Sequence, residues 1–128
     1  MIIDTSALLA ILQGEPEAAP FASAIIDARD PRLPACAFVE ATLKRSFRIL
    51  PELREGLDRL VTRFRIEVVP FTADHAQVAA DARRRFGSGP NALNFGDCMV
   101  YAVAKLAEVP LLYKGVDFAQ TDVPSALA

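Results

Sequence analysis

Four short, largely apolar runs alternate along the chain with longer stretches of helical periodicity. The runs are residues 1–3, 32–35, 66–71 and 111–113. Parallel strands that are covered on both faces are short and apolar, and a crossover connection joins each one to the next. The alternation therefore predicts an α/β domain with a mainly parallel central sheet, to which Val123 adds a last edge strand.

Between the runs, the spacing of apolar residues and the positions of turn-forming residues predict helices. They cover residues 7–13, a segment beginning at Pro16, residues 38–50, residues 52–65, a segment that Thr72 or Asp74 caps and that ends at Phe86, and residues 95–108. Residues 87–91 are predicted to form a loop. No repeat or linker interrupts the pattern, so residues 1–128 are expected to form a single domain.

The composition is that of a folded domain with a slight apolar excess, because 52% of the residues are hydrophobic. Such an excess suggests a partner or dimer face. No run reaches the length of a membrane-spanning helix and the opening residues do not resemble a secretory leader, so we expect a cytoplasmic protein. Cys36 and Cys98 have no metal or redox spacing and are expected to be free thiols.

The formal net charge of −2 argues against nucleic-acid binding by the surface as a whole. The basic residues are nevertheless clustered in the sequence. The clusters are Lys44, Arg45 and Arg48; Arg54, Arg59, Arg63 and Arg65; and Arg83, Arg84 and Arg85. Solvated helix faces and contacts with an anionic partner are alternative interpretations of these clusters.

Four acidic residues are predicted to meet at one edge of the sheet. Asp4 ends the first apolar run, and Asp117 follows the last one. Asp97 lies near the start of the 95–108 helix, and Glu40 lies in the first turn of the helix after the second run. Because ligands of an open parallel sheet bind beyond the carboxyl ends of its strands, these acids are the candidate functional residues.

Clustered carboxylates repel one another, and this repulsion favours a bound cation. Mg²⁺ prefers carboxylate oxygens and keeps part of its water shell. A cation held in this way activates a water molecule and stabilises the oxygens of a phosphoryl transfer. The four acids therefore predict a metal site suited to hydrolysis of phosphodiester bonds.

Each acid also has a structural interpretation. Asp4 and Asp97 lie where helix caps are expected, Glu40 where it can interact with a helix dipole, and Asp117 in a turn. Their shared position at one sheet edge is the reason to favour a single site over four separate structural roles.

The polar residues beside the acids are open to the same two interpretations. Thr5 and Ser6 either orient Asp4 or a metal-bound water, or they are only the hydroxyls of a helix N-terminus. Asn94 either contacts an acid or the substrate, or it caps the 95–108 helix. His75, the single histidine, lies far from the acids in sequence and is interpreted as a surface or packing residue.

Four segments that contain the acids form a recognisable set. They are residues 1–8 (MIIDTSAL), residues 38–40 (FVE), residues 92–98 (ALNFGDC) followed by Tyr101-Ala102, and residues 111–118 (LLYKGVDF) followed by Thr121-Asp122. Together they resemble the motifs of VapC-type PIN-domain toxins, of the VapBC toxin–antitoxin family. The resemblance spans essentially the whole chain, and the last two segments are its most specific parts.

The resemblance implies a PIN-like three-layer α/β/α sandwich and an Mg²⁺- or Mn²⁺-dependent endoribonuclease. It also implies a homodimer that is neutralised by a VapB-like antitoxin docking into the acidic groove. Asp4 and Asp97 carry over as the principal metal ligands, and Glu40 and Asp117 as further acids of the site. Val116 departs from the closing motif, which often has an acid at this position, and this departure puts the metal affinity in question.

Three other interpretations compete with this one. A receiver-like phosphoacceptor domain needs paired acids after the first strand, where Asp4 is single. A haloacid-dehalogenase-like phosphatase needs a second Asp where Ser6 stands. The strongest rival is a catalytically weak family member that binds the antitoxin and regulates its own promoter; the presence of all four acids favours the enzyme.

Overall fold

In the computed structural model, which describes residues 1–127, four short strands pair side by side in one parallel sheet. They are β1 (Ile2–Ile3), β2 (Arg32–Pro34), β3 (Glu67–Val69) and β4 (Leu111–Leu112). The strand order is β3-β2-β1-β4, and every pairing is parallel. Ile2 and Ile3 of the central strand are fully buried. The predicted parallel sheet is therefore confirmed.

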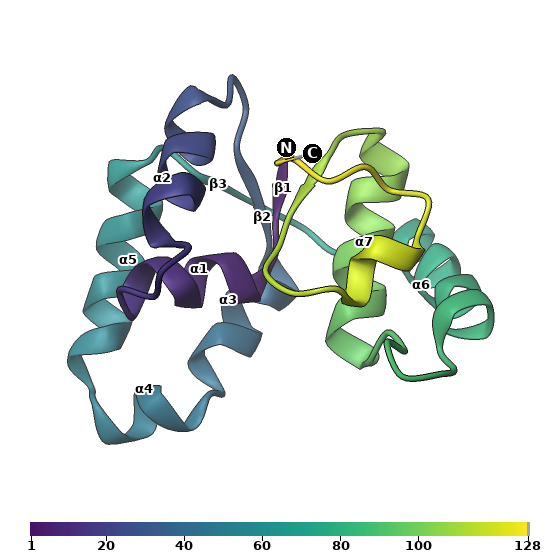
Figure 1. Cartoon of the computed structure of the whole chain (residues 1–128), viewed down its shortest axis with the longest axis horizontal. Coiled ribbons are helices and arrows are strands. Elements are labelled where there is room, and N and C mark those ends of the chain that lie inside the picture. The colour runs from purple at the N-terminus through teal and green to yellow at the C-terminus, as the bar shows by residue number, and fades with distance from the viewer. Residues whose placement is uncertain (128) are drawn as a thin grey trace.

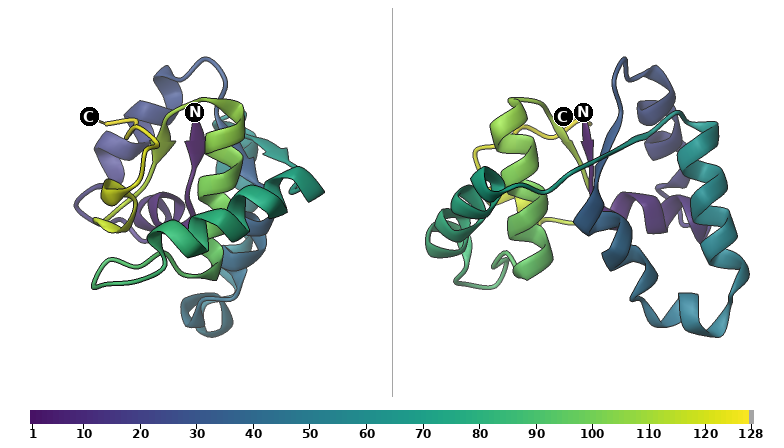
Figure 2. Two further views of the ribbon diagram at one scale, coloured as in Figure 1. Left: turned by 90° about the vertical axis from the view of Figure 1, so that its right-hand side faces the viewer. Right: turned by 180° about the vertical axis from the view of Figure 1, so that it is seen from behind.

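Within residues 1–127, seven helices and one 3₁₀ turn surround the sheet. They are α1 (Thr5–Leu12), α2 (Ala18–Asp27), α3 (Ala35–Thr42), α4 (Arg45–Ile49), α5 (Glu52–Arg63), α6 (Ala73–Phe86), α7 (Phe95–Ala107) and η1 (Asp117–Gln120). Helices α1, α2 and α5 lie on one side of the sheet and α6 and α7 on the other, so the three-layer α/β/α arrangement is confirmed (Figure 1). Helix α3 packs against α1 and α7, and it begins where β2 ends (Figure 2).

The core is centred on β1 and on α7, which is buried on most of its circumference. Val100, Ala102 and Ala104 of α7 are completely inaccessible to solvent, and Tyr101 is 1% exposed. A helix that is apolar on nearly all sides has to lie in the interior of a domain. No helix among the described residues is long and apolar enough to cross a membrane.

The prediction of one helix over residues 38–50 is wrong. The helix begins earlier, at Ala35, and Lys44 then adopts an extended conformation (ψ 143°) that separates α3 from α4. The Thr42 hydroxyl donates to the Val39 carbonyl at 2.7 Å, a local bond that competes with helix continuation. The break lets Phe47 reach the core, where it is 8% exposed. Because the helix begins at Ala35, Glu40 lies in its second turn rather than in the first.

The predicted edge strand at Val123 is also wrong. The parallel bridge forms between Leu111 and Ser125, two residues further along the chain. The backbone N–H of Val123 instead donates to Thr121 Oγ1 at 3.3 Å, and the Val123 side chain is buried. Val123 therefore anchors the last segment through apolar contact rather than through strand pairing.

Candidate functional site

Asp4 lies where β1 gives way to α1, and it is almost completely buried, at 5% exposure. It is the N-cap residue of α1: its Oδ2 accepts hydrogen bonds from the backbone N–H and from the hydroxyl of Ser6. Burial raises the pKa of the Asp4 carboxyl, the bonds from Ser6 oppose this effect, and the charge of Glu40 adds to it. Asp4 is thus both the predicted cap and a carboxylate whose buried charge is only partly compensated.

Ser6 and Thr5 have different partners. Ser6 Oγ donates to Asp4 and accepts a 3.0 Å bond from the backbone N–H of Lys114, in the segment that follows β4. The Thr5 hydroxyl donates to the carbonyl of Ala37 at 3.1 Å and so ties α1 to α3. Of these two hydroxyls, only that of Ser6 contacts the Asp4 carboxylate.

Asp97 and Asn94 form a reciprocal cap at the start of α7. Asn94 Oδ1 accepts from the Asp97 N–H at 2.8 Å, and Asp97 Oδ2 accepts from the Asn94 N–H at 3.1 Å. Burial raises the pKa of Asp97 to about 6; the Asn94 bond opposes this shift, and the charges of Asp4 and Asp117 add to it. An acid whose ionised form is this unfavourable is a candidate functional group.

Glu40 faces α7 across Gly96. A methyl group at Gly96 would overlap the Glu40 carboxylate, so the glycine leaves open the space that this carboxylate occupies beside α7. Burial raises the pKa of Glu40; the nearby ammonium of Lys44, 4.0 Å from Oε1, opposes the shift, and the charge of Asp97 adds to it. No role was assigned to Gly96 from the sequence, although a glycine in the first turn of an apolar helix indicates that another group approaches closely.

Repulsion between their charges links the four acids to one another. Asp97 is destabilised by Asp4 and Asp117, and Glu40 interacts with both Asp4 and Asp97. Asp117, the first residue of η1, is exposed. Among residues 1–127, however, no three His, Cys, Asp or Glu side chains already form a group that could hold a metal ion.

The donor set nevertheless fits a hard divalent cation. All four candidate groups are carboxylates, and burial and repulsion between acids disfavour the charge of Asp4, Glu40 and Asp97 in the absence of a cation. Mg²⁺ needs only one or two protein carboxylates, because water fills its remaining positions. A preformed cage of three or more acids is therefore not required.

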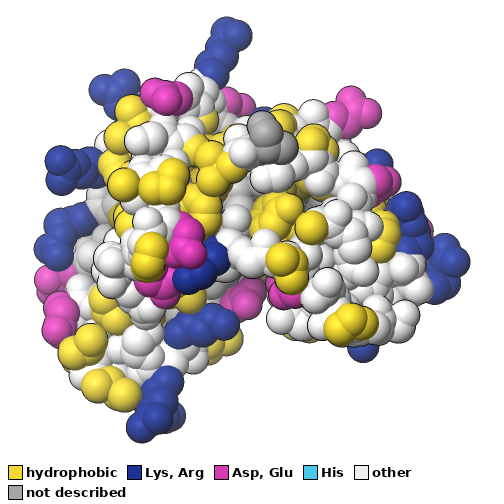
Figure 3. Space-filling view, viewed as in Figure 1, with side chains coloured by type: hydrophobic (Ala, Val, Ile, Leu, Met, Phe, Trp, Pro, Cys, Tyr) yellow, Lys and Arg dark blue, Asp and Glu magenta, His cyan; other side chains and the backbone are white. Residues whose placement is uncertain are grey.

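A hollow of about 510 Å³ lies between α3 and α7, beside Glu40. Its rim carries three large apolar side chains that are exposed to solvent: Phe95 (80%), Leu43 (76%) and Val39 (56%). The sequence did not indicate this patch, because periodicity assigns the apolar residues of a helix to its core face. Figure 3 shows a recess between the side of the molecule formed by α1, α2 and α5 and the side formed by α6 and α7. Acidic side chains lie at this recess, and basic side chains lie over α4, on one side of it.

His75 and the two cysteines lie outside this arrangement. His75 Nδ1 accepts from the Thr72 N–H at 2.9 Å and completes the cap of α6, so its structural interpretation is confirmed. Both Cys36 and Cys98 are free thiols, as predicted, and burial raises the pKa of each. They are therefore protonated at neutral pH.

The parallel three-layer fold, with acids at the carboxyl ends of its strands, is the arrangement expected of a PIN domain. The PIN domain family model matches residues 1–124. The chain is 43% identical over 126 residues to ribonuclease VapC36 of Mycobacterium tuberculosis, covering 96% of this chain and 91% of that one. The chain therefore belongs to the PIN domain family, among its VapC members.

Solved structures with little sequence similarity share the same fold. The crystal structure of VapC20 from Mycobacterium tuberculosis, described as a sarcin–ricin loop cleaving toxin, has a TM-score of 0.76 at 16% identity and covers 95% of each chain. A toxin–antitoxin complex from Klebsiella pneumoniae has a TM-score of 0.74 at 18% identity, covering 98% of this chain and 96% of that one.

Proposed function

We propose that this protein is the ribonuclease toxin of a VapBC-type toxin–antitoxin pair, and that it hydrolyses RNA phosphodiester bonds with Mg²⁺ or Mn²⁺ at the four acids. The ribonuclease activity is supported by membership of the VapC family, whose relative VapC36 is named a ribonuclease. The main support for the metal site is the clustering of acids at this edge of the sheet, where burial and the charges of Asp4 and Asp117 raise the pKa of Asp97 to about 6. A divalent cation removes this repulsion, since it brings opposite charge to the carboxylates.

In this proposal Asp4 and Asp97 are the principal ligands, and Glu40 and Asp117 are further acids of the site. The bound metal supplies the positive charge that activates a water molecule and stabilises the phosphate oxygens. Ser6 orients Asp4 through its two hydrogen bonds, and Asn94 orients Asp97 through the reciprocal cap. The raised pKa of Glu40 suits its carboxylate to accept a proton from water at an Oε atom.

The proposal includes two protein partners, a VapB-like antitoxin and a second copy of the chain. An antitoxin as binding partner is supported by the toxin–antitoxin complex from Klebsiella pneumoniae, which has the same fold. The exposed apolar side chains of Val39, Leu43 and Phe95 support a homodimer, because a contiguous exposed apolar patch is typical of an interaction surface. A particle of twice the chain mass of 13.9 kDa, measured by light scattering, is the expected result.

The deciding experiment measures RNA cleavage by the purified protein with Mg²⁺ or Mn²⁺ and with EDTA. A structured RNA such as tRNA and a linear oligonucleotide serve as substrates, and Asp4→Asn and Asp97→Asn serve as variants. Metal-dependent cleavage that both substitutions remove is the expected result. Folded, metal-loaded protein that cuts no RNA would favour the rival function, a catalytically weak subunit that binds the antitoxin and regulates its promoter.

A further inference from the structure

Three basic residues lie at the break between α3 and α4 and on α4 itself. Lys44 lies in the break, and its Nζ is 4.0 Å from Glu40 Oε1. Arg45 and Arg48 follow on α4, and both are exposed. Because residues three apart in a helix lie on the same side, Arg45 and Arg48 form one cationic edge that continues from Lys44.

Arg45 and Arg48 differ from most basic residues of this protein in having no acidic partner. Ion pairs elsewhere join Arg32 to Asp30, Arg54 to Asp58, Arg59 to Glu55, Arg84 to Asp81, Arg85 and Lys105 to Asp122, and Lys114 to Glu15 and Glu17. Within residues 1–127, neither Arg45 nor Arg48 has a carboxylate oxygen within 4.0 Å. Their guanidinium groups are therefore available to an anionic ligand.

Helix α4 is held firmly although it has only five residues. Phe47 is buried in the core, and Gln13 Nε2 donates to Ser46 Oγ at 3.0 Å, which ties α4 to the end of α1. A hollow of about 430 Å³ lies along the helix. Its lining is Thr42, Leu43, Lys44, Arg45, Phe47 and Arg48. The helix is thus anchored on one side and presents its cations beside a surface depression on the other.

We propose that Arg45 and Arg48 bind phosphates of the RNA substrate, which runs along α4 toward the acids. This inference rests on the proposed nuclease function and names the part of the surface that holds the substrate. A chain with a net charge of −2 needs such a local cationic track, because its surface as a whole does not attract a polyanion. Arginine suits the role since its planar guanidinium donates two parallel hydrogen bonds to phosphate oxygens.

The test compares RNA binding by the wild-type protein and by the Arg45→Gln/Arg48→Gln double variant. The fluorescence anisotropy of a short labelled single-stranded RNA is measured over a range of salt concentrations in EDTA, so that no metal-dependent cleavage occurs. Loss of both contacts is expected to reduce the slope of log affinity against log salt by about 1.4, because each phosphate contact in a single strand contributes about 0.7. Lys44 is left unchanged because it lies beside Glu40.

The matched control is Arg63→Gln/Arg65→Gln, which removes the same charge. Both residues are exposed and, in the described part of the chain, unpaired. Arg63 is the last residue of α5 and Arg65 lies two residues beyond it, so both are about 18 Å from the start of the helix near α4. The control is expected to bind RNA with the wild-type slope, and circular dichroism checks that both double variants are folded.

Equal slopes for the two double variants, or no RNA binding by the wild type, would overturn the proposal. Unchanged RNA binding by Arg45→Gln/Arg48→Gln with loss of antitoxin binding would also overturn it and would assign the edge to an acidic protein segment. Cleavage by the wild type is assayed in parallel with Mg²⁺. A wild type that binds RNA through this edge but cuts none would contradict the nuclease function while leaving the binding edge supported.

Discussion

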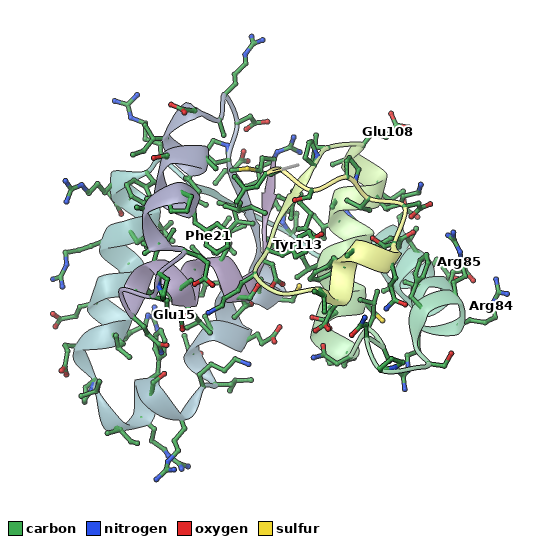
Figure 4. The ribbon with its side chains drawn as sticks, in the orientation of Figure 1. Glu15, Phe21, Arg84, Arg85, Glu108 and Tyr113 are labelled. Atoms are coloured by element: carbon green, nitrogen blue, oxygen red, sulfur yellow. The ribbon has the colours of Figure 1, made fainter. Side chains whose placement is uncertain are left out.

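The backbone N–H of Lys114 donates a 3.0 Å hydrogen bond to Ser6 Oγ, so the segment after β4 is attached directly to the first turn of α1. The Lys114 ammonium pairs with Glu15 and Glu17, beyond the other end of α1. In Figure 4, Glu15 and Tyr113, the residue before Lys114, are labelled on the two segments that these contacts join. Because Ser6 Oγ donates in turn to Asp4, residues from opposite ends of the sequence hold this carboxylate in place.

Ser6→Ala is expected to weaken metal binding while leaving the fold intact. The substitution removes a hydrogen bond to Asp4 and the attachment to Lys114, and loss of an outer-shell partner typically lowers metal affinity by roughly 10- to 100-fold. Calorimetric titration with Mn²⁺ measures the change. Ser46→Ala is the matched control, since the Ser46 hydroxyl contacts only Gln13 among the described side chains. Equal affinities of Ser6→Ala and the wild type would contradict a role for Ser6 in orienting Asp4.

Asp97→Asn is expected to abolish cleavage and to make the metal-free fold more stable at alkaline pH. The pKa of Asp97 is about 6 in the folded chain and its ordinary value is 3.8, so the folded state holds the proton more tightly. Wild-type stability therefore falls as pH rises from about 4 to about 6 and stays lower above this window. The variant lacks this loss, so thermal melts in EDTA are expected to give it the higher Tm at pH 8 and a similar Tm near pH 4.

The effect of added Mg²⁺ on the Tm of the wild type and of Asp97→Asn is measured in the same thermal melts. Mg²⁺ is expected to raise the Tm of the wild type at pH 8, because a ligand that binds only the folded state stabilises it. The same addition is expected to change the Tm of Asp97→Asn much less. Wild-type stability that is constant between pH 4 and pH 7 in EDTA would disagree with the raised pKa of Asp97.

Gly96→Ala is expected to lower the cleavage rate by roughly 10- to 100-fold, because the new methyl group displaces the Glu40 carboxylate and small displacements of a reacting group are this costly. Stability is expected to change by less than about 1 kcal/mol, since the gain in helix propensity offsets the displacement. Gly56→Ala, in α5, is the control: its methyl group meets Leu12 at an ordinary 3.4 Å. A Gly96→Ala protein with wild-type cleavage would show that the position of Glu40 is not critical.

Asp122→Asn is expected to destabilise the fold by about 1 kcal/mol at neutral pH, a value that allows for the partial exposure of this carboxylate. Asp122 accepts hydrogen bonds from Lys105 Nζ (2.8 Å) and the Tyr101 hydroxyl (2.7 Å), which lower its pKa to about 2. Its contribution is therefore complete above the ordinary carboxyl pKa and is lost as pH falls toward about 2. Urea denaturation at pH 7 and at pH 3 measures the effect, and the difference between the two proteins should shrink at the lower pH.

The local features of the site could be predicted from short stretches of sequence. The apolar run before Asp4 predicted a buried strand that ends at this residue, and the structure confirms both the strand and the helix that Asp4 caps. Asn94 and Asp97 were placed correctly at the start of a helix. Caps and short buried strands depend on residues within about four positions of one another, so their signals are contained in the sequence. The roles of the four acids in catalysis remain predictions.

Other features depended on contacts between distant parts of the chain. The break at Lys44 lets Phe47 pack into a core formed by other elements, and the start of α3 at Ala35, directly after β2, sets the turn in which Glu40 lies. The approach of Glu40 to Gly96 brings together helices that are separated by more than 50 residues. The sequence by itself determined the parallel α/β fold and the residue types of the site, because hydrophobic periodicity and capping are local. Only the tertiary structure decided which side chains meet, since packing overrides local helix propensity wherever a buried side chain requires a different path.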